Sequence, residues 1–341
     1  MPSFSNSALR LLGRLVGARP PAPAEAGELR VLDGNSAVAL SEASIAGHAV
    51  LGGTSPVSQA DSVWLREVER GGTNLFGETL SADAADGPRG IVAAATGLAL
   101  AGRRATAFLS GPDVAAAQDL VLSAAGKHAP LVLHRGTRAA TAHGSASGSG
   151  HDTAHLCADS GCFLLFASNV QQAVDFTFLA RRIAEDALVS GIVVMDGAQT
   201  ALGAQDVRLL SPAQVEGFIG PAREQVETPT PAQKLLFGET RRRLPAWHDL
   251  DEPMLTGAIF DEQGFALGAT ANHAFFDDFV ASLPEPLQFL IDPLGFLKDR
   301  LVMELEDLAL GLAHEIRNPL ASIRGGVQEL GSGRLGPEQV E

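Results

Sequence analysis

The chain has 341 residues, 45% of them hydrophobic and 19% charged, which is the composition of a globular protein long enough for two domains. Its formal net charge of −15 argues against nucleic acid bound through phosphates and against adhesion to an anionic membrane, because both partners need a basic surface. No nucleic-acid or membrane partner is expected.

Two cysteines, Cys157 and Cys162, limit the redox chemistry of the chain. An iron–sulfur cluster is usually held by four cysteine thiolates, so the chain cannot carry a conventional cluster alone. His151 and His155 give the cysteines a spacing that zinc could use, but we favour a core role for the cysteines and predict no metal. The lack of a disulfide framework and of an apolar run of about 18–20 residues predicts a cytoplasmic protein without a membrane span.

Residues 1–28 read as a short amphipathic segment followed by a stiff linker of proline and alanine. From residue 29 to about 222, short apolar runs alternate with longer amphipathic stretches. The apolar runs, which we expect to be strands, are 49–51, 105–109, 131–133, 163–167 and 192–195. The amphipathic stretches, which we expect to be helices, are 36–46, 57–69, 90–101, 114–125 and 170–188. This alternation predicts one α/β domain over 29–222, with a doubly wound, mostly parallel sheet.

Four turns follow these strands, and ligands of a doubly wound sheet bind at that edge. The turns span 52–56, 110–112, 134–138 and 196–197. The glycine- and serine-rich stretch 142–150 is predicted to be a mobile loop. A boundary rich in proline and threonine at 224–231 introduces a linker and appended segment, which we assign to 223–293.

Residues 294–341 follow a different pattern. Apolar side chains recur in steps of three or four from Leu301 to Leu330, which predicts one long amphipathic helix with a narrow apolar seam. A seam of this kind usually pairs with another helix, so we expect a homodimer through 294–330.

Several segments of the first domain resemble, in order and spacing, the N-terminal domain of pyruvate:ferredoxin oxidoreductases. They are DGNSAVA at 33–39, TSPVS at 54–58, AGRRATAFLSGP at 101–112, TR at 137–138, ASNVQQ at 167–172 and MDGAQT at 195–200. The resemblance implies a thiamine-diphosphate-binding-like fold for 29–222.

In that family this domain binds the aminopyrimidine half of thiamine diphosphate, and a glutamate takes part in proton transfer at the ring. That position falls on Pro88, which cannot relay a proton. We therefore expect a catalytically degenerate domain and leave thiamine diphosphate binding open. The resemblance also supplies candidate ligand-binding residues, which are Ser55, Ser110, Gly111, Arg138 and His151.

Residues 313–320 read AHEIRNPL, which resembles the H-box of nitrogen-regulation-type sensor histidine kinases. The resemblance makes His314 the phosphoacceptor, Glu315 its base and Asn318 a residue that orients water or the phosphate. Helix geometry places His314 away from the apolar seam, where solvent can reach it. No nucleotide-binding domain is recognised after this helix, so ATP would act through a missing or separate domain.

We therefore predict a sensor histidine kinase-type signalling protein, in which a degenerate oxidoreductase-like input domain precedes an incomplete phosphoacceptor helix. Its expected partners are a second copy, a response-regulator receiver domain, and a redox protein or small 2-oxoacid as the input. The alternative prediction is a subunit of a 2-oxoacid:ferredoxin oxidoreductase that binds thiamine diphosphate with partner subunits. A scaffold with neither chemistry is the third.

Overall fold

A six-stranded sheet forms the centre of the protein. The computed structural model describes residues 27–139, 150, 152–158 and 160–246. The strands of the central sheet are β2 (His48–Leu51), β3 (Ser81–Ala84), β4 (Ala105–Ser110), β5 (Val132–Gly136), β6 (Phe163–Ala167) and β7 (Gly191–Met195). Their order is β3-β2-β4-β5-β7-β6, and every neighbouring pair is parallel. The predicted doubly wound α/β fold is confirmed.

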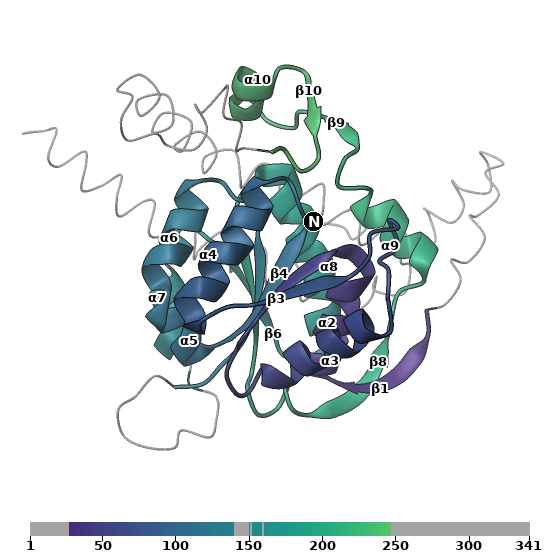
Figure 1. The fold of residues 1–341 in the computed structure, drawn as a ribbon, viewed down its shortest axis with the longest axis vertical. Helices are drawn as coiled ribbons and strands as arrows, with labels where there is room; N and C mark the ends of the chain where they lie inside the picture. Colours follow the sequence, from purple (N-terminus) through teal and green to yellow (C-terminus); the bar gives the residue numbers. More distant parts are fainter. Residues whose placement is uncertain (1–26, 140–149, 151, 159, 247–341) are drawn as a thin grey trace, which may run out of the picture.

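Helices cover both faces of this sheet (Figure 1). One layer contains α2 (Gly34–Ile45), α3 (Ser58–Glu69) and α8 (Val170–Ala187). The other layer contains α4 (Gly87–Leu100), α5 (Gly111–Ala116), α6 (Gln118–Gly126) and α7 (Asp152–Ala158). The chain therefore forms three layers, with the sheet between two groups of helices.

Burial on both faces explains why most residues of the inner strands are apolar. Along β4, Phe108 belongs to the core shared with α2, α3 and α8, whereas Ala107 and Leu109 belong to the core shared with α4 to α7. Alternate side chains of one strand point to opposite faces, so each inner strand supplies both cores.

Each expected strand and helix of this domain has a counterpart in the structure, and the additional elements that were not expected are β1 (Leu29–Asp33), β3, α7, β8 (Ala204–Arg208) and α9 (Pro212–Ile219). The stretch predicted as one helix over 114–125 is divided into α5 and α6, because the backbone of Ala117 leaves helical geometry at φ −115°. The edge strand β3 was not expected, because its sequence SADA contains polar residues and no apolar run. A strand at the edge of a sheet has less buried surface and needs fewer apolar side chains.

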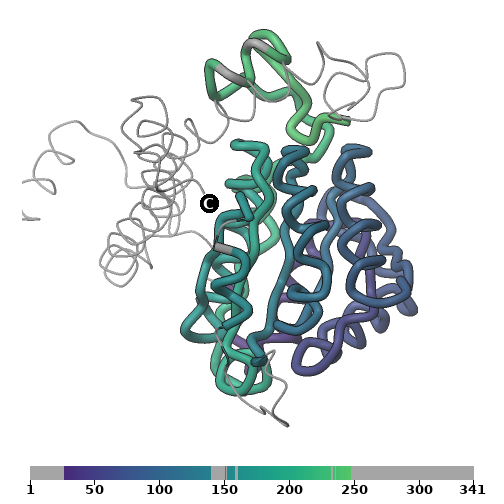
Figure 2. The backbone as a smooth tube through the Cα atoms, turned by 90° about the vertical axis from the view of Figure 1, so that its left-hand side faces the viewer, coloured from purple at the N-terminus to yellow at the C-terminus, as the bar shows by residue number. Residues whose placement is uncertain are grey.

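The remaining described elements lie around the central layers. Two small antiparallel ladders pair β1 (Leu29–Asp33) with β8 (Ala204–Arg208), and β9 (Gln225–Glu227) with β10 (Thr240–Arg242). Helices α9 (Pro212–Ile219) and α10 (Pro231–Phe237) complete this part of the chain. The segment with β9, α10 and β10 extends beyond one end of the layers in both views (Figures 1 and 2).

That segment is held at the end of the sheet where the strands begin. The Arg241 guanidinium donates to the carbonyl oxygens of Glu185 and Asp186, near the C-terminus of α8, at 2.7 and 3.0 Å. It therefore lies opposite the edge where ligands of this fold bind. The expected domain boundary at 222 and 223 stays a prediction, and the expected helix over 294–330 lies outside the described residues.

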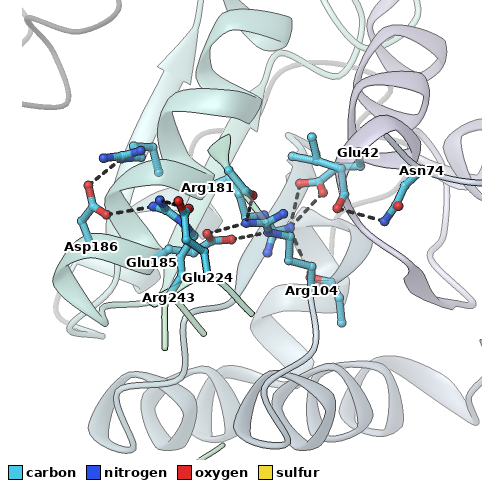
Figure 3. Close-up of polar contacts among 12 residues, drawn as sticks. Glu42, Asn74, Arg104, Arg181, Glu185, Asp186, Glu224 and Arg243 are labelled. Carbon is cyan, nitrogen blue, oxygen red and sulfur yellow. Dashed lines mark hydrogen bonds and ion pairs between the residues drawn. The ribbon is translucent and has the colours of Figure 1, made fainter. Parts of the chain in front are cut away.

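Buried ion pairs connect the strands to α8 (Figure 3). Arg104, just before β4, donates to both carboxylate oxygens of Glu185 at 2.6 and 2.8 Å. Glu42 of α2 accepts from Arg181 at 2.8 Å and lies 2.8 Å from Nε2 of His134. Charged side chains are rarely buried without partners, and these pairs satisfy that rule.

No helix among the described residues combines the length and apolar character needed to cross a bilayer.

Candidate functional site

The strand order reverses between β2 and β4. The chain runs from β2 outward to β3 and then returns to β4 on the other side of β2. In an open parallel sheet, ligands bind in the crevice outside the carboxyl ends of the strands at this switch point. The turn after β2, residues 52–57, and the turn after β4, residues 110–113, meet at this place.

The turn after β2 is pressed against neighbouring backbone. A Cβ added to Gly53 would lie 2.0 Å from the carbonyl oxygen of Phe108, so only glycine fits there. The Ser55–Pro56 peptide bond is cis, and the Pro56 carbonyl accepts from the Asn35 side chain at 2.8 Å. Strand β4 and helix α2 thus hold the turn from two sides.

The turn after β4 is bonded directly to the turn after β2. Ser110 and Asp113 form a capping box at the start of α5. The Asp113 carboxylate also accepts from the backbone N–H of Thr54 at 2.9 Å and from its hydroxyl at 2.9 Å. The Thr54 hydroxyl lies 2.7 Å from that of Ser110. The Asp113 carboxylate thus accepts hydrogen bonds from donors of both turns, which are Thr54 and the backbone N–H of Ser110.

A second carboxylate, from α3, also accepts hydrogen bonds from the turn after β2. Oδ2 of Asp61, on α3, accepts from the backbone N–H groups of Gly52 and Gly53 at 2.9 and 3.0 Å. Burial raises the pKa of Asp61 to about 6, and the negative charge of Asp113 adds to that shift. The amides of residues 52, 53 and 54 all donate to carboxylates of the chain itself.

Arg138, which follows β5, provides a positive charge at this edge that is not fully buried. Its Nη1 donates to the Ser55 carbonyl oxygen at 3.3 Å, which is a long hydrogen bond. Within the described part of the chain, no carboxylate lies within ion-pair distance of its guanidinium. The side chain is half-buried, so it remains accessible to a ligand.

Four of the five candidate ligand-binding residues meet at this edge of the sheet. Ser55 touches Arg138, and Gly111 lies so close to the Arg138 backbone that an added Cβ would be 2.2 Å from its carbonyl oxygen. Ser110 precedes Gly111 at the same turn. The fifth candidate, His151, lies outside the described residues.

Three residues of the site were not among the candidates: Thr54, Asp61 and Asp113. The spacing Ser110-x-x-Asp113 is a capping-box signal in the sequence. Asp61 and Thr54 carry no comparable signal, because their bonds are made by the tertiary arrangement of α3, β2 and β4.

The position expected to carry the proton-relaying glutamate does not fit an activated aminopyrimidine ring. Pro88 lies in the first turn of α4 and has neither a carboxylate nor a backbone N–H. Asp86, at the N-cap, makes no side-chain cap bond and is exposed, and Asp83 pairs with His48. In the described part of α4 and β3, these positions therefore supply no group in place to activate thiamine diphosphate.

Comparison with known families identifies the matched part of the chain. The family model described as pyruvate flavodoxin/ferredoxin oxidoreductase, thiamine diphosphate-binding, matches residues 84–264. The alpha subunit of the NADH-dependent phenylglyoxylate dehydrogenase of Aromatoleum evansii is 31% identical over 138 residues, which are 40% of this chain and 33% of the relative. A pyruvate synthase subunit of Thermotoga maritima is 33% identical over 131 residues, 38% of this chain and 33% of the relative.

A longer relative and a solved structure agree with this match. The pyruvate-flavodoxin oxidoreductase of Enterobacter agglomerans is 27% identical over 187 residues, 54% of this chain and 16% of the relative. The chain thus spans about a third or less of the curated relatives it matches. The 2-oxoglutarate:ferredoxin oxidoreductase of Magnetococcus marinus shares the fold, with a TM-score of 0.52 and 16% identity over 77% of this chain and 46% of that one.

These matches correct the prediction of a sensor histidine kinase-type signalling protein. The proteins named above are oxidoreductases, and nothing in the comparisons supports a kinase or a phosphorelay. They favour the alternative prediction, an oxidoreductase subunit. The expected phosphoacceptor His314 lies outside the described residues, as do Glu315 and Asn318. The expected ATP, receiver-domain and homodimer partners stay untested.

Proposed function

Because this chain belongs to the thiamine diphosphate-binding family of pyruvate flavodoxin/ferredoxin oxidoreductases, we propose that it is a subunit that binds a 2-oxoacid and acts in 2-oxoacid oxidation with partner chains. The relatives are named for phenylglyoxylate and pyruvate, and the solved structure that shares the fold of this chain is an enzyme for 2-oxoglutarate. All of these substrates are 2-oxoacids and carry a carboxylate next to a ketone.

The position and partial burial of Arg138 are the main support for the proposal. Arg138 is a half-buried guanidinium at the carboxyl end of the central strand β5, beside the switch-point turns. A guanidinium presents a planar fork of donors that matches a carboxylate with two parallel hydrogen bonds. One long bond to Ser55 leaves most of these donors for a ligand. We propose that the Arg138 guanidinium binds the carboxylate of the 2-oxoacid.

The partners must supply what these residues lack. Pro88 offers no proton-relaying carboxylate, so we derive no catalytic step through thiamine diphosphate from this chain. The two cysteines are both buried, and a conventional cluster requires four thiolates. Cofactor activation and electron transfer therefore belong to other chains in this proposal.

Binding of 2-oxoacids to the purified full chain tests the proposal directly. We expect saturable binding of pyruvate, phenylglyoxylate or 2-oxoglutarate by isothermal titration calorimetry. Arg138→Met should weaken it by roughly 10–100-fold, because a hydrogen bond to a charged group contributes about 1.5–3 kcal/mol. The matched control Arg103→Met removes an exposed arginine away from the site and should leave the affinity unchanged.

Two results would overturn the proposal. One is the absence of binding for all three acids at millimolar concentration. The other is an Arg138→Met protein that folds and binds as tightly as the unaltered chain. A third measurement concerns partners: the chain alone, given thiamine diphosphate, magnesium and an artificial electron acceptor, should show no turnover of the acid that it binds.

A further inference from the structure

His48, Ser81 and Asp83 form a hydrogen-bonded group on the two outermost strands at one side of the sheet. Nδ1 of His48, on β2, lies 2.7 Å from the Ser81 hydroxyl oxygen on β3. Nε2 of the same ring lies 3.0 Å from Oδ2 of Asp83. A hydroxyl, an imidazole and a carboxylate are thus linked in series, the arrangement that activates a serine nucleophile on unrelated folds.

The register of the two parallel strands creates this group. His48 is the direct partner of Ser81 in the β2–β3 ladder. Asp83 is two residues further along β3, so its side chain points to the same face as that of Ser81. Both serine and carboxylate therefore reach one imidazole without distortion of the strands.

The distances favour one tautomer of His48. With the proton on Nε2, the ring donates to Asp83, and the bare Nδ1 accepts from the Ser81 hydroxyl. The competing acceptor for that hydroxyl is the Gly47 carbonyl oxygen at 3.1 Å, which is farther than Nδ1 at 2.7 Å. His48 is therefore placed as the general base for Ser81, and Asp83 as the group that orients it.

The group is accessible from one side. Among the described residues, β3 is the last strand of the sheet, so no further described strand covers it. Ser81 is half-buried and the Asp83 side chain is 69% exposed, while the His48 side chain between them is only 9% exposed. The base is shielded from water, and the nucleophile lies within reach of a small molecule.

A backbone donor lies next to the serine. The N–H groups of Ser81 and Ala85 point to β2, where they donate to Gly47 and Leu51. Because the direction alternates along a strand, the N–H of Ala82 points away from β2, to the outer edge. The amide after a nucleophilic serine is a donor that commonly stabilises the oxyanion of acyl transfer.

We propose that Ser81 is a nucleophile for acyl transfer from small carboxylic esters or thioesters, with His48 as base and Asp83 as its positioning residue. Ser81 Oγ forms a bond to the carbonyl carbon while its proton passes to His48 Nδ1. The bond to the alcohol or thiol breaks, and the leaving group departs with that proton. Water then cleaves the acyl-serine by the reverse proton route, which releases the acid and restores the hydroxyl. This inference does not depend on the proposed function.

An alkyl fluorophosphonate, which loses fluoride on reaction with an activated serine, tests the proposal on the full chain. Intact-mass measurement should show one adduct, and peptide mapping should place it on Ser81. Ser81→Ala should take up no label. His48→Gln should be labelled about 100-fold more slowly, because general-base catalysis contributes about 10²–10⁴-fold. Hydrolysis of p-nitrophenyl acetate should fall in parallel.

A matched control separates this role from general serine reactivity. Ser123 is also half-buried, and its hydroxyl accepts from Lys127 at 2.9 Å instead of contacting a histidine. Ser123→Ala should be labelled at the unaltered rate. If His48→Gln fails to fold by circular dichroism, Asp83→Asn replaces it, since that side chain is mostly exposed. An adduct elsewhere, no adduct, or an unaltered rate in the folded His48 or Asp83 variant would overturn the proposal.

Discussion

Three consecutive amides, those of Gly52, Gly53 and Thr54, donate to Asp61 and Asp113 at the switch point. Successive backbone N–H groups in a turn form a concave anion-binding surface, and many folds use such a surface for phosphates. Here two carboxylates of the chain take these donors. The turn is therefore already neutralised, and an added anion at this edge has Arg138 as its available charge.

Asp61 makes the stability of the protein depend on pH with a defined sign. Its folded pKa of about 6 lies above the ordinary value of 3.8, so the folded state holds the proton more tightly than the unfolded state. The stabilisation is complete below pH 3.8 and is lost as the pH rises towards 6. We expect the unaltered chain to lose on the order of 2–3 kcal/mol relative to Asp61→Asn between about pH 4 and pH 7.

Urea unfolding at several pH values measures this difference. The side-chain amide in Asp61→Asn would keep an oxygen to accept from Gly52 and Gly53 but would not titrate, so the variant isolates the carboxyl group. Asp206→Asn, at an exposed position of β8, serves as the control. Parallel stability curves for the unaltered chain and Asp61→Asn would contradict the prediction.

At the residue scale, the sequence indicated which residues lie at this edge of the sheet, but it did not indicate which hydrogen bonds they make. Ser55, Ser110, Gly111 and Arg138 were found because they follow strands in a family-like order, and all four meet at one edge. The role of Asp61 could not be predicted, because it accepts from Gly52 and Gly53 only when α3 packs beside the end of β2. The local sequence does not determine this packing.

Among the described elements, α8 takes part in two buried ion pairs. Its residues Arg181 and Glu185 bind Glu42 on α2 and Arg104 before β4 (Figure 3). Arg104 also donates to the Gly220 carbonyl oxygen at 2.8 Å, at the end of α9. Directly through Arg181 and Glu185, and indirectly through Arg104, α8 is thus linked to α2, to the start of β4 and to the end of α9.

Breaking one side of the Arg104–Glu185 pair should be far more costly than removing both charges. Each side chain is at most 1% exposed, so Arg104→Met would leave a buried carboxylate without its partner. We expect a loss of about 3–5 kcal/mol for each single variant, Arg104→Met and Glu185→Leu. The double variant should lose clearly less than the sum of the two.

A double-mutant cycle in urea tests this coupling. The exposed pair Lys234–Glu239 provides the control, because its side chains are 48% and 84% exposed and its removal should change stability little. Additive losses for Arg104 and Glu185 would show that the pair contributes no interaction of its own.

Sequence patterns predicted elements where burial is uniform and failed where it is not. The strands covered on both faces contain recognisable apolar runs, and the helix expected over 170–188 matches α8 almost residue for residue. The division between α5 and α6 was missed because residues 114–125 have no glycine or proline to mark it. The first residues of α5 are bonded to the turn after β2 through Asp113, and such a tertiary constraint on this short helix is not visible in the local sequence.

At the scale of the whole molecule, the two cores share their strands. Val50, Leu109 and Val194 belong to the core beneath α4 to α7, and their neighbours Leu51, Phe108 and Val193 belong to the core beneath α2, α3 and α8. Removing the helices from one face would expose the apolar residues on that face of the same strands that form the other core. The described layers should therefore unfold together.

One residue in each core reports on its unfolding. Trp64 is fully buried in the core with α2, α3 and α8, and Trp247→Phe removes the second tryptophan so that fluorescence follows Trp64 alone. Cys162 is buried in the opposite core, where burial raises the pKa of its thiol to about 12. A thiol reagent attacks the thiolate, so Cys162 should react slowly until its core opens. Cys157→Ala isolates it.

We expect the urea midpoint for loss of Trp64 fluorescence to coincide with the midpoint for exposure of Cys162. Strands β2, β4 and β7 each contribute to both cores, so neither side can open while the other keeps its strand residues covered. If Cys162 became reactive at a lower urea concentration than the Trp64 transition, the layer with α4 to α7 would unfold first and the prediction would be wrong. The sheet would then stay folded with α2, α3 and α8, and ligand binding at the switch point would stabilise that half alone.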